Sequence, residues 1–271
     1  MMKKVICVLL IFLMMTGTAY AEETILPVGE IMPISAGDAF DFDEDGVPET
    51  LEYEILRSED GYDEGYRLKI GDSEVTADGW CMNEELYVLK LDDYTTPLLM
   101  VSDYGPSDDY ETHFYLYENS SLLSAGTIAS LPEGMRVRDG VITASVRGEI
   151  LYTWFHDEDF ALARALGEDG QISAAMHRIP RALYPMSLIV TMKTDLPLLV
   201  SQTNPDVSAT VYTGEQVILC ASDDVEWVYI ESLETESAGW MQVNREMGFE
   251  CIVGEELLFS DNVFDGLLFA D

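Results

Sequence analysis

Positive charge is scarce in this sequence of 271 residues. Lysine and arginine together number 14, against 51 aspartates and glutamates, so the formal net charge is −37 at pH 7. Proteins that bind nucleic acid or anionic membranes concentrate basic side chains on the contact surface. The charge balance therefore argues against both of these partners, and a surface of this kind attracts divalent cations instead.

The sequence also lacks the short motifs of common catalytic sites. It contains no Gly-x-Ser-x-Gly elbow, no Gly-x-x-x-x-Gly-Lys-Ser/Thr loop and no Gly-x-Gly-x-x-Gly turn, which argues against acyl transfer by that route and against nucleotide binding. Its three histidines, His113, His156 and His177, lie far apart and at no metal-ligand spacing, so each is expected to be a half-buried strand residue. We therefore expect a protein without catalytic activity.

Two enzymatic alternatives depend on single residue types. Cys81 could serve a thiol hydrolase, but its segment DGWCMNEE places acidic neighbours beside the thiol, and these raise a thiol pKa rather than lower it. A carboxylate pair for hydrolysis of the cell wall or of a glycan stays open. With 51 acidic residues some pair is inevitable, so no particular pair is indicated.

Long hydrophobic runs are absent beyond the first residues. The chain begins with MMKK, continues with an apolar run over residues 5–15 and reaches Ala19-Tyr20-Ala21. These are the three parts of a secretory signal peptide, which predicts removal of residues 1–21. The run is too short to span a bilayer comfortably. We expect an exported, soluble protein that is secreted or associated with the cell envelope.

Cysteine is rare as well. After removal of the leader three remain, Cys81, Cys220 and Cys251, and an odd number leaves at least one thiol outside any internal disulfide. A bridge between Cys220 and Cys251 is one alternative, and burial of free thiols is the other.

What is abundant is acid, and its most ordered stretch is DFDEDGVPETLE at residues 41–52. Acidic residues recur there at alternate positions and are followed by a glycine and two glutamates: Asp41, Asp43, Asp45, Gly46, Glu49 and Glu52. Alternate carboxylates can turn inward around one hard cation, and glycine allows the sharp bend that such a loop needs. The stretch predicts a calcium site.

The same stretch matches the spacing of an EF-hand loop, with Glu52 in the last position. An EF-hand requires a helix on each side of the loop, however. The following residues Leu51, Tyr53 and Ile55 alternate with polar or charged positions, which is the period of a strand, and Pro48 removes a backbone donor. The pattern predicts a loop followed by a strand.

A loop of this kind before an apolar strand resembles the calcium loops of FG-GAP or VCBS-type repeats, which build the integrin-alpha type of β-propeller blade. The resemblance implies Asp41, Asp43, Asp45 and Glu49 as ligands of Ca²⁺, with Glu52 on the strand. The alternative is an acidic turn that holds ions only loosely.

Residues 22–186 are predicted to form this repeat lobe. Short apolar segments separated by acidic or glycine-bearing turns suggest about twelve strands between residues 50 and 179, enough for three four-stranded units of a partial propeller. The second unit resembles the repeat less closely, because its loop keeps only Asp92 and Asp93. Ligands of such lobes usually bind at loops, and residues 103–110, with two tyrosines among acids, are the first candidate.

Residues 187–271 change in character, with short strands at close spacing that predict a small barrel. Gly214-Glu215, Trp227 and Gly239-Trp240 resemble a bacterial Src-homology-3-like domain. The resemblance implies binding of cell-wall peptides, or a targeting and packing role. Trp227 and Trp240 are expected in the barrel core.

Taken together, the sequence predicts an all-β protein with a propeller-like lobe and a small barrel. We expect an exported, non-catalytic calcium-binding module that acts as a binder or scaffold at the cell envelope, with a cell-wall peptide or an envelope protein as partner. A wall or glycan hydrolase and a structural assembly component are the alternatives.

Overall fold

The computed structural model describes residues 26–92, 95–106, 109–151, 154–167 and 172–267. The fold is all-β, as predicted: the described residues form 22 strands, one short 3-10 helix and one four-residue α-helix, α1 (Ser260–Val263). No helix among the described residues is long and apolar enough to cross a membrane. The expected signal peptide lies outside the described residues, as does Asp93.

Residues 26–179, here called the lobe, form three antiparallel sheets in succession. The first follows chain order through β2 (Ala39–Phe40), β3 (Glu49–Arg57), β4 (Asp63–Ile70) and β5 (Ser73–Asp78). The second runs β1 (Ile31–Ile34), β6 (Met82–Leu89), β7 (Leu98–Asp103), β8 (Glu111–Glu118) and β9 (Ser121–Ile128). The third comprises β10 (Met135–Arg138), β11 (Val141–Arg147), β12 (Phe155–Leu166) and β13 (Ile172–Ile179). The 3-10 helix, Pro132–Gly134, precedes β10.

The second sheet lies between the other two and is buried on both faces. All six residues of β7 are buried. Because successive side chains point to opposite faces, Leu99 and Val101 pack with the first sheet, whereas Leu98 and Met100 pack with the third. The lobe is therefore a stack of three sheets with two hydrophobic layers.

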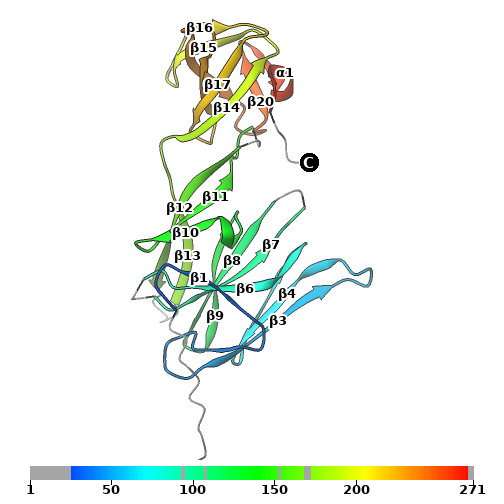
Figure 1. The fold of residues 1–271 in the computed structure, drawn as a ribbon, viewed down its shortest axis with the longest axis vertical. Coiled ribbons are helices and arrows are strands. Elements are labelled where there is room, and N and C mark those ends of the chain that lie inside the picture. The colour runs from blue at the N-terminus through cyan, green and yellow to red at the C-terminus, as the bar shows by residue number, and fades with distance from the viewer. Residues whose placement is uncertain (1–25, 93–94, 107–108, 152–153, 168–171, 268–271) are drawn as a thin grey trace, which may run out of the picture.

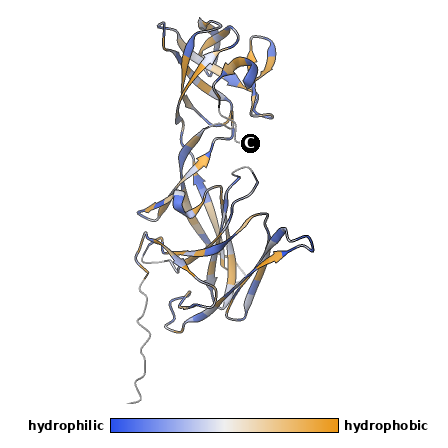
Figure 2. Cartoon of the chain, turned by 45° about the vertical axis from the view of Figure 1, so that its right-hand side comes forward, coloured by the Kyte–Doolittle hydropathy of each residue, from blue (hydrophilic) through white to orange (hydrophobic). Residues whose placement is uncertain are grey.

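The C-terminal part, residues 184–267, is one nine-stranded sheet that curls on itself, here called the curled sheet (Figure 1). Its main path is β16 (Asn204–Val211), β15 (Leu196–Ser201), β19 (Ala238–Val243), β18 (Trp227–Ser232), β17 (Gln216–Ser222), β14 (Tyr184–Met192) and β22 (Phe264–Asp265). β20 (Glu250–Val253) and β21 (Glu256–Phe259) extend it from β19. Hydrophobic residues recur along the strands of both parts (Figure 2).

The expected core position of Trp227 and Trp240 is wrong. Val228 and Met241 fill the interior of the curled sheet. Since side chains alternate along a strand, the neighbouring tryptophans face outward and are only partly buried. On that outer face the rings of Trp240 and Tyr229 lie 5.2 Å apart.

The two parts share a packed junction. Ile150, Leu151 and Trp154, from the connection between β11 and β12, belong to the hydrophobic cluster of the curled sheet, and the Leu151 N–H donates to the carbonyl of Gly248 at 2.7 Å. The strand β14 begins at Tyr184, two residues before the end of the predicted lobe. The curled sheet occupies one end of the long axis of the molecule, above the lobe (Figure 1).

The three cysteines of the described residues are free thiols, and Cys220 and Cys251 form no disulfide. Cys81 is exposed, Cys220 is partly buried and Cys251 is buried. Burial raises the pKa of Cys251 to about 12, so this thiol behaves as a small core hydrophobe.

Candidate metal centre

The acidic loop is shaped by its own side chains. The two carboxylate oxygens of Asp41 accept the N–H groups of Asp45, at 3.0 Å, and Gly46, at 2.9 Å. Asp43 also accepts from Asp45, at 3.3 Å. Gly46 has φ +89°, a conformation that glycine adopts without steric strain. The aspartates thus hold the turn that the sequence pattern predicts.

The alternate residues of the loop anchor it to the lobe. Phe42 is 1% exposed and belongs to the core between the first and second sheets. Glu44 forms an ion pair with Lys90, which follows β6 in the second sheet. The N–H of Phe42 donates to Glu49 Oε2 at 3.0 Å. The chain continues directly into β3, which confirms the prediction of a strand after the loop and excludes an EF-hand.

Three of the four predicted ligands converge. Carboxylate oxygens of Asp41, Asp43 and Glu49 lie within 4.8 Å of one another. Two oxygens that bind one calcium ion at its usual distances are separated by at most about 5 Å, so one ion can reach all three. Asp45 lies outside this group and its carboxylate accepts the Val47 N–H at 2.8 Å. Glu52 pairs with Lys69 on the neighbouring strand.

The converging carboxylates repel one another. Burial raises the pKa of Glu49, and the negative charges of Asp43 and Asp41 raise it further, although the hydrogen bond from Phe42 opposes the shift. Among the described residues, no ion pair involves Asp41, Asp43 or Glu49. A bound divalent cation would relieve this repulsion.

The surroundings of Glu49 join two sheets. A side chain at Gly71, in the turn between β4 and β5, would meet the Tyr117 hydroxyl at 2.8 Å and Glu49 Cγ at 3.8 Å. Tyr117 belongs to β8, and its pKa is raised by burial and also by the charges of Glu49 and Asp43. The acidic loop therefore lies where the first sheet meets the second.

The donor set fits a hard cation. All three groups are carboxylates, which calcium and magnesium prefer over nitrogen or sulfur ligands. Three carboxylates supply up to six oxygens, and calcium takes six to eight. Asp41, Asp43 and Glu49 would hold the ion, whose role there is to fix the loop.

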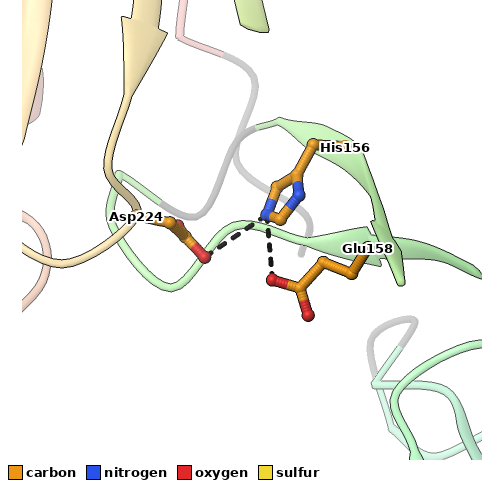
Figure 3. Close-up of side chains that lie close together, drawn as sticks. All are labelled: His156, Glu158 and Asp224. Carbon is orange, nitrogen blue, oxygen red and sulfur yellow. Dashed lines mark hydrogen bonds and ion pairs between the residues drawn. The ribbon is translucent and has the colours of Figure 1, made fainter. Parts of the chain in front are cut away.

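A second cluster joins the lobe to the curled sheet (Figure 3). His156 and Glu158 lie on β12, and Asp224 lies in the turn between β17 and β18. The Nε2 atom of His156 lies 3.3 Å from Asp224 Oδ2 and 3.9 Å from Glu158 Oε1. The three side chains are 0%, 6% and 1% exposed, in the order His156, Glu158, Asp224.

Arg178 of β13 shows that this second cluster is an ion-pair network. Its Nη2 atom pairs with Glu158 and lies 3.4 Å from Asp224 Oδ2, so a cation already lies between the two carboxylates. Among the described residues, His156 Nδ1 has no hydrogen-bond partner, whereas a metal-bound imidazole is normally held by a bond from its other nitrogen. The cluster does not fit a metal centre.

The sequence did not indicate this network. His113 and His177 lie on strands, one half-buried and one exposed, but His156 is buried among charges instead of half-buried as expected. The alternation His156-x-Glu158 does predict two side chains on one face of a strand. Its partner Asp224 is 68 positions from His156, and no local pattern connects them.

The predicted ligand loop, residues 103–110, is divided in role. Asp103 is buried and accepts the N–H groups of Trp80 and Cys81 at 2.8 and 2.9 Å, so it is structural. Asp109 and Tyr110 line a cleft of about 270 Å³ between the second and third sheets. Its other lining residues are Glu111, Thr127, Ala129, Arg147 and Phe155. Residues 107–108 of the predicted loop lie outside the described part of the chain.

No family model, curated protein or solved structure matches this chain.

Proposed function

We propose that this protein is an exported, non-catalytic β scaffold in which a calcium ion at Asp41, Asp43 and Glu49 holds the first sheet against the second. The observation that carries the proposal is the convergence of three carboxylates within 4.8 Å in a loop that enters a strand. Phe42 buries the other face of the loop in the core. A cation that fixed the acidic side would therefore also fix the packing of the two sheets.

The arrangement of the lobe supports the repeat-like interpretation. Each of the three stacked sheets contains a meander of four successive strands, β2 to β5, β6 to β9 and β10 to β13, as four-stranded units of a partial propeller would. β1 adds a fifth strand at the edge of the second sheet. The curled sheet of short strands supports the interpretation of the C-terminal part as a Src-homology-3-like module. Both assignments belong to the proposal.

The partner would be a cell-wall peptide or an envelope protein, and it would bind in the cleft lined by Asp109 and Tyr110. The cleft combines acidic groups with the exposed ring of Phe155, and Arg147 pairs with Asp109 at its edge. Such a mixture of aromatic and charged side chains is typical of a binding surface on a rigid scaffold. A peptide with basic groups suits the acidic lining.

Calorimetric titration with calcium chloride tests the metal part of the proposal, using the chain from Glu22 to Asp271. We expect one ion per chain for the wild type and loss of binding for Asp43→Asn and Glu49→Gln. Asp45→Asn is the matched control, because Asp45 lies in the same loop but outside the group. Absence of binding at millimolar calcium, or equal binding by all variants, would contradict the site.

Sedimentation with purified peptidoglycan tests the partner, with Phe155→Ala as the cleft variant. We expect the wild type to pellet with the wall and the variant to remain in solution, without release of soluble wall fragments in either case. Soluble fragments formed at a rate above the protein-free control would show a hydrolase instead.

A further inference from the structure

We propose that uptake of one proton by the buried cluster of His156, Glu158, Arg178 and Asp224 stabilises the junction between the lobe and the curled sheet. The junction is therefore tighter at mildly acidic pH than at neutral pH. The inference does not depend on the calcium site, which lies in another part of the lobe.

Asp224 connects the curled sheet to the lobe. Its Oδ1 atom accepts the N–H of Glu149 at 2.8 Å, and its Oδ2 atom faces His156 Nε2 at 3.3 Å and Arg178 Nη2 at 3.4 Å. The N–H of Asp224 donates to Ser222 within its own turn. One buried carboxylate of the curled sheet thus contacts three lobe residues, and the state of this cluster affects the whole junction.

The charges of the cluster do not balance when His156 is neutral. Glu158 and Asp224 each carry one negative charge, and Arg178 supplies one positive charge, which leaves one negative charge in excess. Placing an uncompensated charge in a buried site is costly. One additional proton, on the imidazole or on a carboxylate, makes the cluster neutral.

The geometry allows the cluster to hold this proton. Since carboxylates only accept hydrogen bonds, Nε2 of His156, which faces both of them, carries a hydrogen. A proton on Nδ1 would have no acceptor among the described residues, so a carboxylate is the place for the additional proton. Burial raises the pKa of Glu158, and the charge of Asp224 adds to this, although Arg178 and His156 lower it. Glu158, which faces His156 and Arg178, is therefore the acceptor for this proton.

The basic residues near His156 other than Arg178 have partners elsewhere, and Arg181 pairs with Asp159. Trp154 and Tyr184 lie on the imidazole, with ring centroids at 4.6 and 4.2 Å. The Tyr184 hydroxyl accepts hydrogen bonds from Arg178 and from the N–H of Arg181. On β12, Asp157 is directed away from the cluster and pairs with Arg136. Among the described residues, Arg178 is the one cation that contacts the two buried carboxylates.

The sign of the pH dependence follows from proton uptake. A group whose pKa is higher in the docked state than in the open state favours docking at low pH, and the advantage is lost as pH rises through the docked-state pKa. Glu158 has a raised pKa, and proton uptake by the cluster acts in the same direction. The junction is thus expected to open more often as the medium turns from mildly acidic to neutral.

Hydrogen exchange of the chain from Glu22 to Asp271, compared at mildly acidic and at neutral pH, tests the inference. Peptides covering residues 154–160, 178–186 and 222–228 report on the junction, and β7 serves as an internal reference. After correction for intrinsic exchange, we expect protection of the junction to fall with rising pH by up to about tenfold per pH unit, with no such slope in β7.

Two variants separate this proton from ordinary packing. Asp224→Asn keeps an acceptor for the Glu149 N–H, makes the cluster neutral without added protons, and suits the positive φ of +58° at this position because asparagine tolerates the left-handed region. Its junction should be independent of pH. Asp157→Asn, a neutralisation on the exposed side of the same strand, should retain the wild-type slope. Glu158→Gln provides a second neutralisation and should also abolish the slope.

Three outcomes would overturn the inference. One is a wild-type junction whose protection does not change with pH. Another is an unchanged slope in both Asp224→Asn and Glu158→Gln. The third is stoichiometric binding of Zn²⁺ by the wild type that disappears in Asp224→Asn, because this result would assign the cluster to a metal. If the variants fail to fold, the pH dependence of the wild-type junction, compared with β7, decides the inference.

Discussion

The hydroxyls of Tyr66 and Tyr115 lie 2.6 Å apart between two sheets of the lobe. Tyr66 is on β4 and Tyr115 on β8, and both side chains are buried. Burial raises the pKa of each hydroxyl. Each tyrosine thus provides the other with a hydrogen-bond partner in a place closed to water, and the pair links the first sheet to the second.

The tyrosine pair should be strongly coupled. Tyr66→Phe or Tyr115→Phe alone leaves one buried hydroxyl without its partner, which costs about 1–3 kcal/mol. The double variant leaves no hydroxyl unpaired, so its loss in the free energy of unfolding should be smaller than the sum of the two single losses. Urea denaturation of the four proteins measures this coupling. Additive losses would show that the two hydroxyls do not depend on each other.

Calcium binding should displace protons from Glu49. Its pKa is raised by burial and by the charges of Asp43 and Asp41. At mildly acidic pH and without metal, a larger fraction of Glu49 is therefore protonated than of an ordinary glutamate. Calcium binds the carboxylate, and its affinity should fall as pH is lowered through the raised pKa. Calorimetry in buffers of different ionisation enthalpy measures the protons released. Release of no protons near pH 5 would contradict this role of Glu49.

In the metal-free protein, Glu49 has the opposite effect on the pH dependence of stability. A raised folded-state pKa means that the folded chain binds the proton more strongly than the unfolded chain. The contribution of Glu49 to stability is therefore present at low pH and is lost as pH rises through the raised pKa. Calcium should reverse this trend, so thermal unfolding with calcium and with a chelator should diverge as pH rises. Glu49→Gln should remove the divergence.

Gly46 should be needed for the shape of the loop. Its φ is +89° and no atom lies within 4 Å of where a Cβ would be placed, so Gly46→Ala meets backbone strain of about 1–2 kcal/mol and no steric clash. We expect weaker calcium binding together with lower stability. Gly214→Ala is the matched control. Gly214 has a similar φ of +92° and equally open surroundings, but it lies in the curled sheet. It should lose similar stability and bind calcium as the wild type does.

Local patterns predicted what local forces determine. The strand after the acidic loop follows from alternation at Leu51 and Tyr53, and the structure confirms it. Asp45 fits the spacing of a ligand but lies outside the carboxylate group, and its carboxylate accepts the Val47 N–H. Spacing alone does not tell a ligand from a residue that stabilises the turn. Calcium binding itself stays a prediction.

Contacts between distant segments were beyond such reasoning. The network of His156 and Asp224 forms only because the connection between β11 and β12 packs into the curled sheet. The sequence predicted short strands in the C-terminal part, but the inward face that it assigned to Trp227 and Trp240 was wrong. A period of two fixes which residues share a face, and packing against the other strands decides which face is buried.

The two faces of β19 should respond differently to truncation. Met241 is 1% exposed in the core of the curled sheet, and Met241→Ala removes buried apolar volume, which costs about 2–5 kcal/mol. Trp240, its larger neighbour, contacts Tyr229 on the outer face and is only partly buried. Trp240→Ala should therefore cost less despite the greater change in size. Chemical denaturation of both variants decides between the faces, and a larger loss for Trp240→Ala would place the tryptophan, and not the methionine, at the centre of the packing.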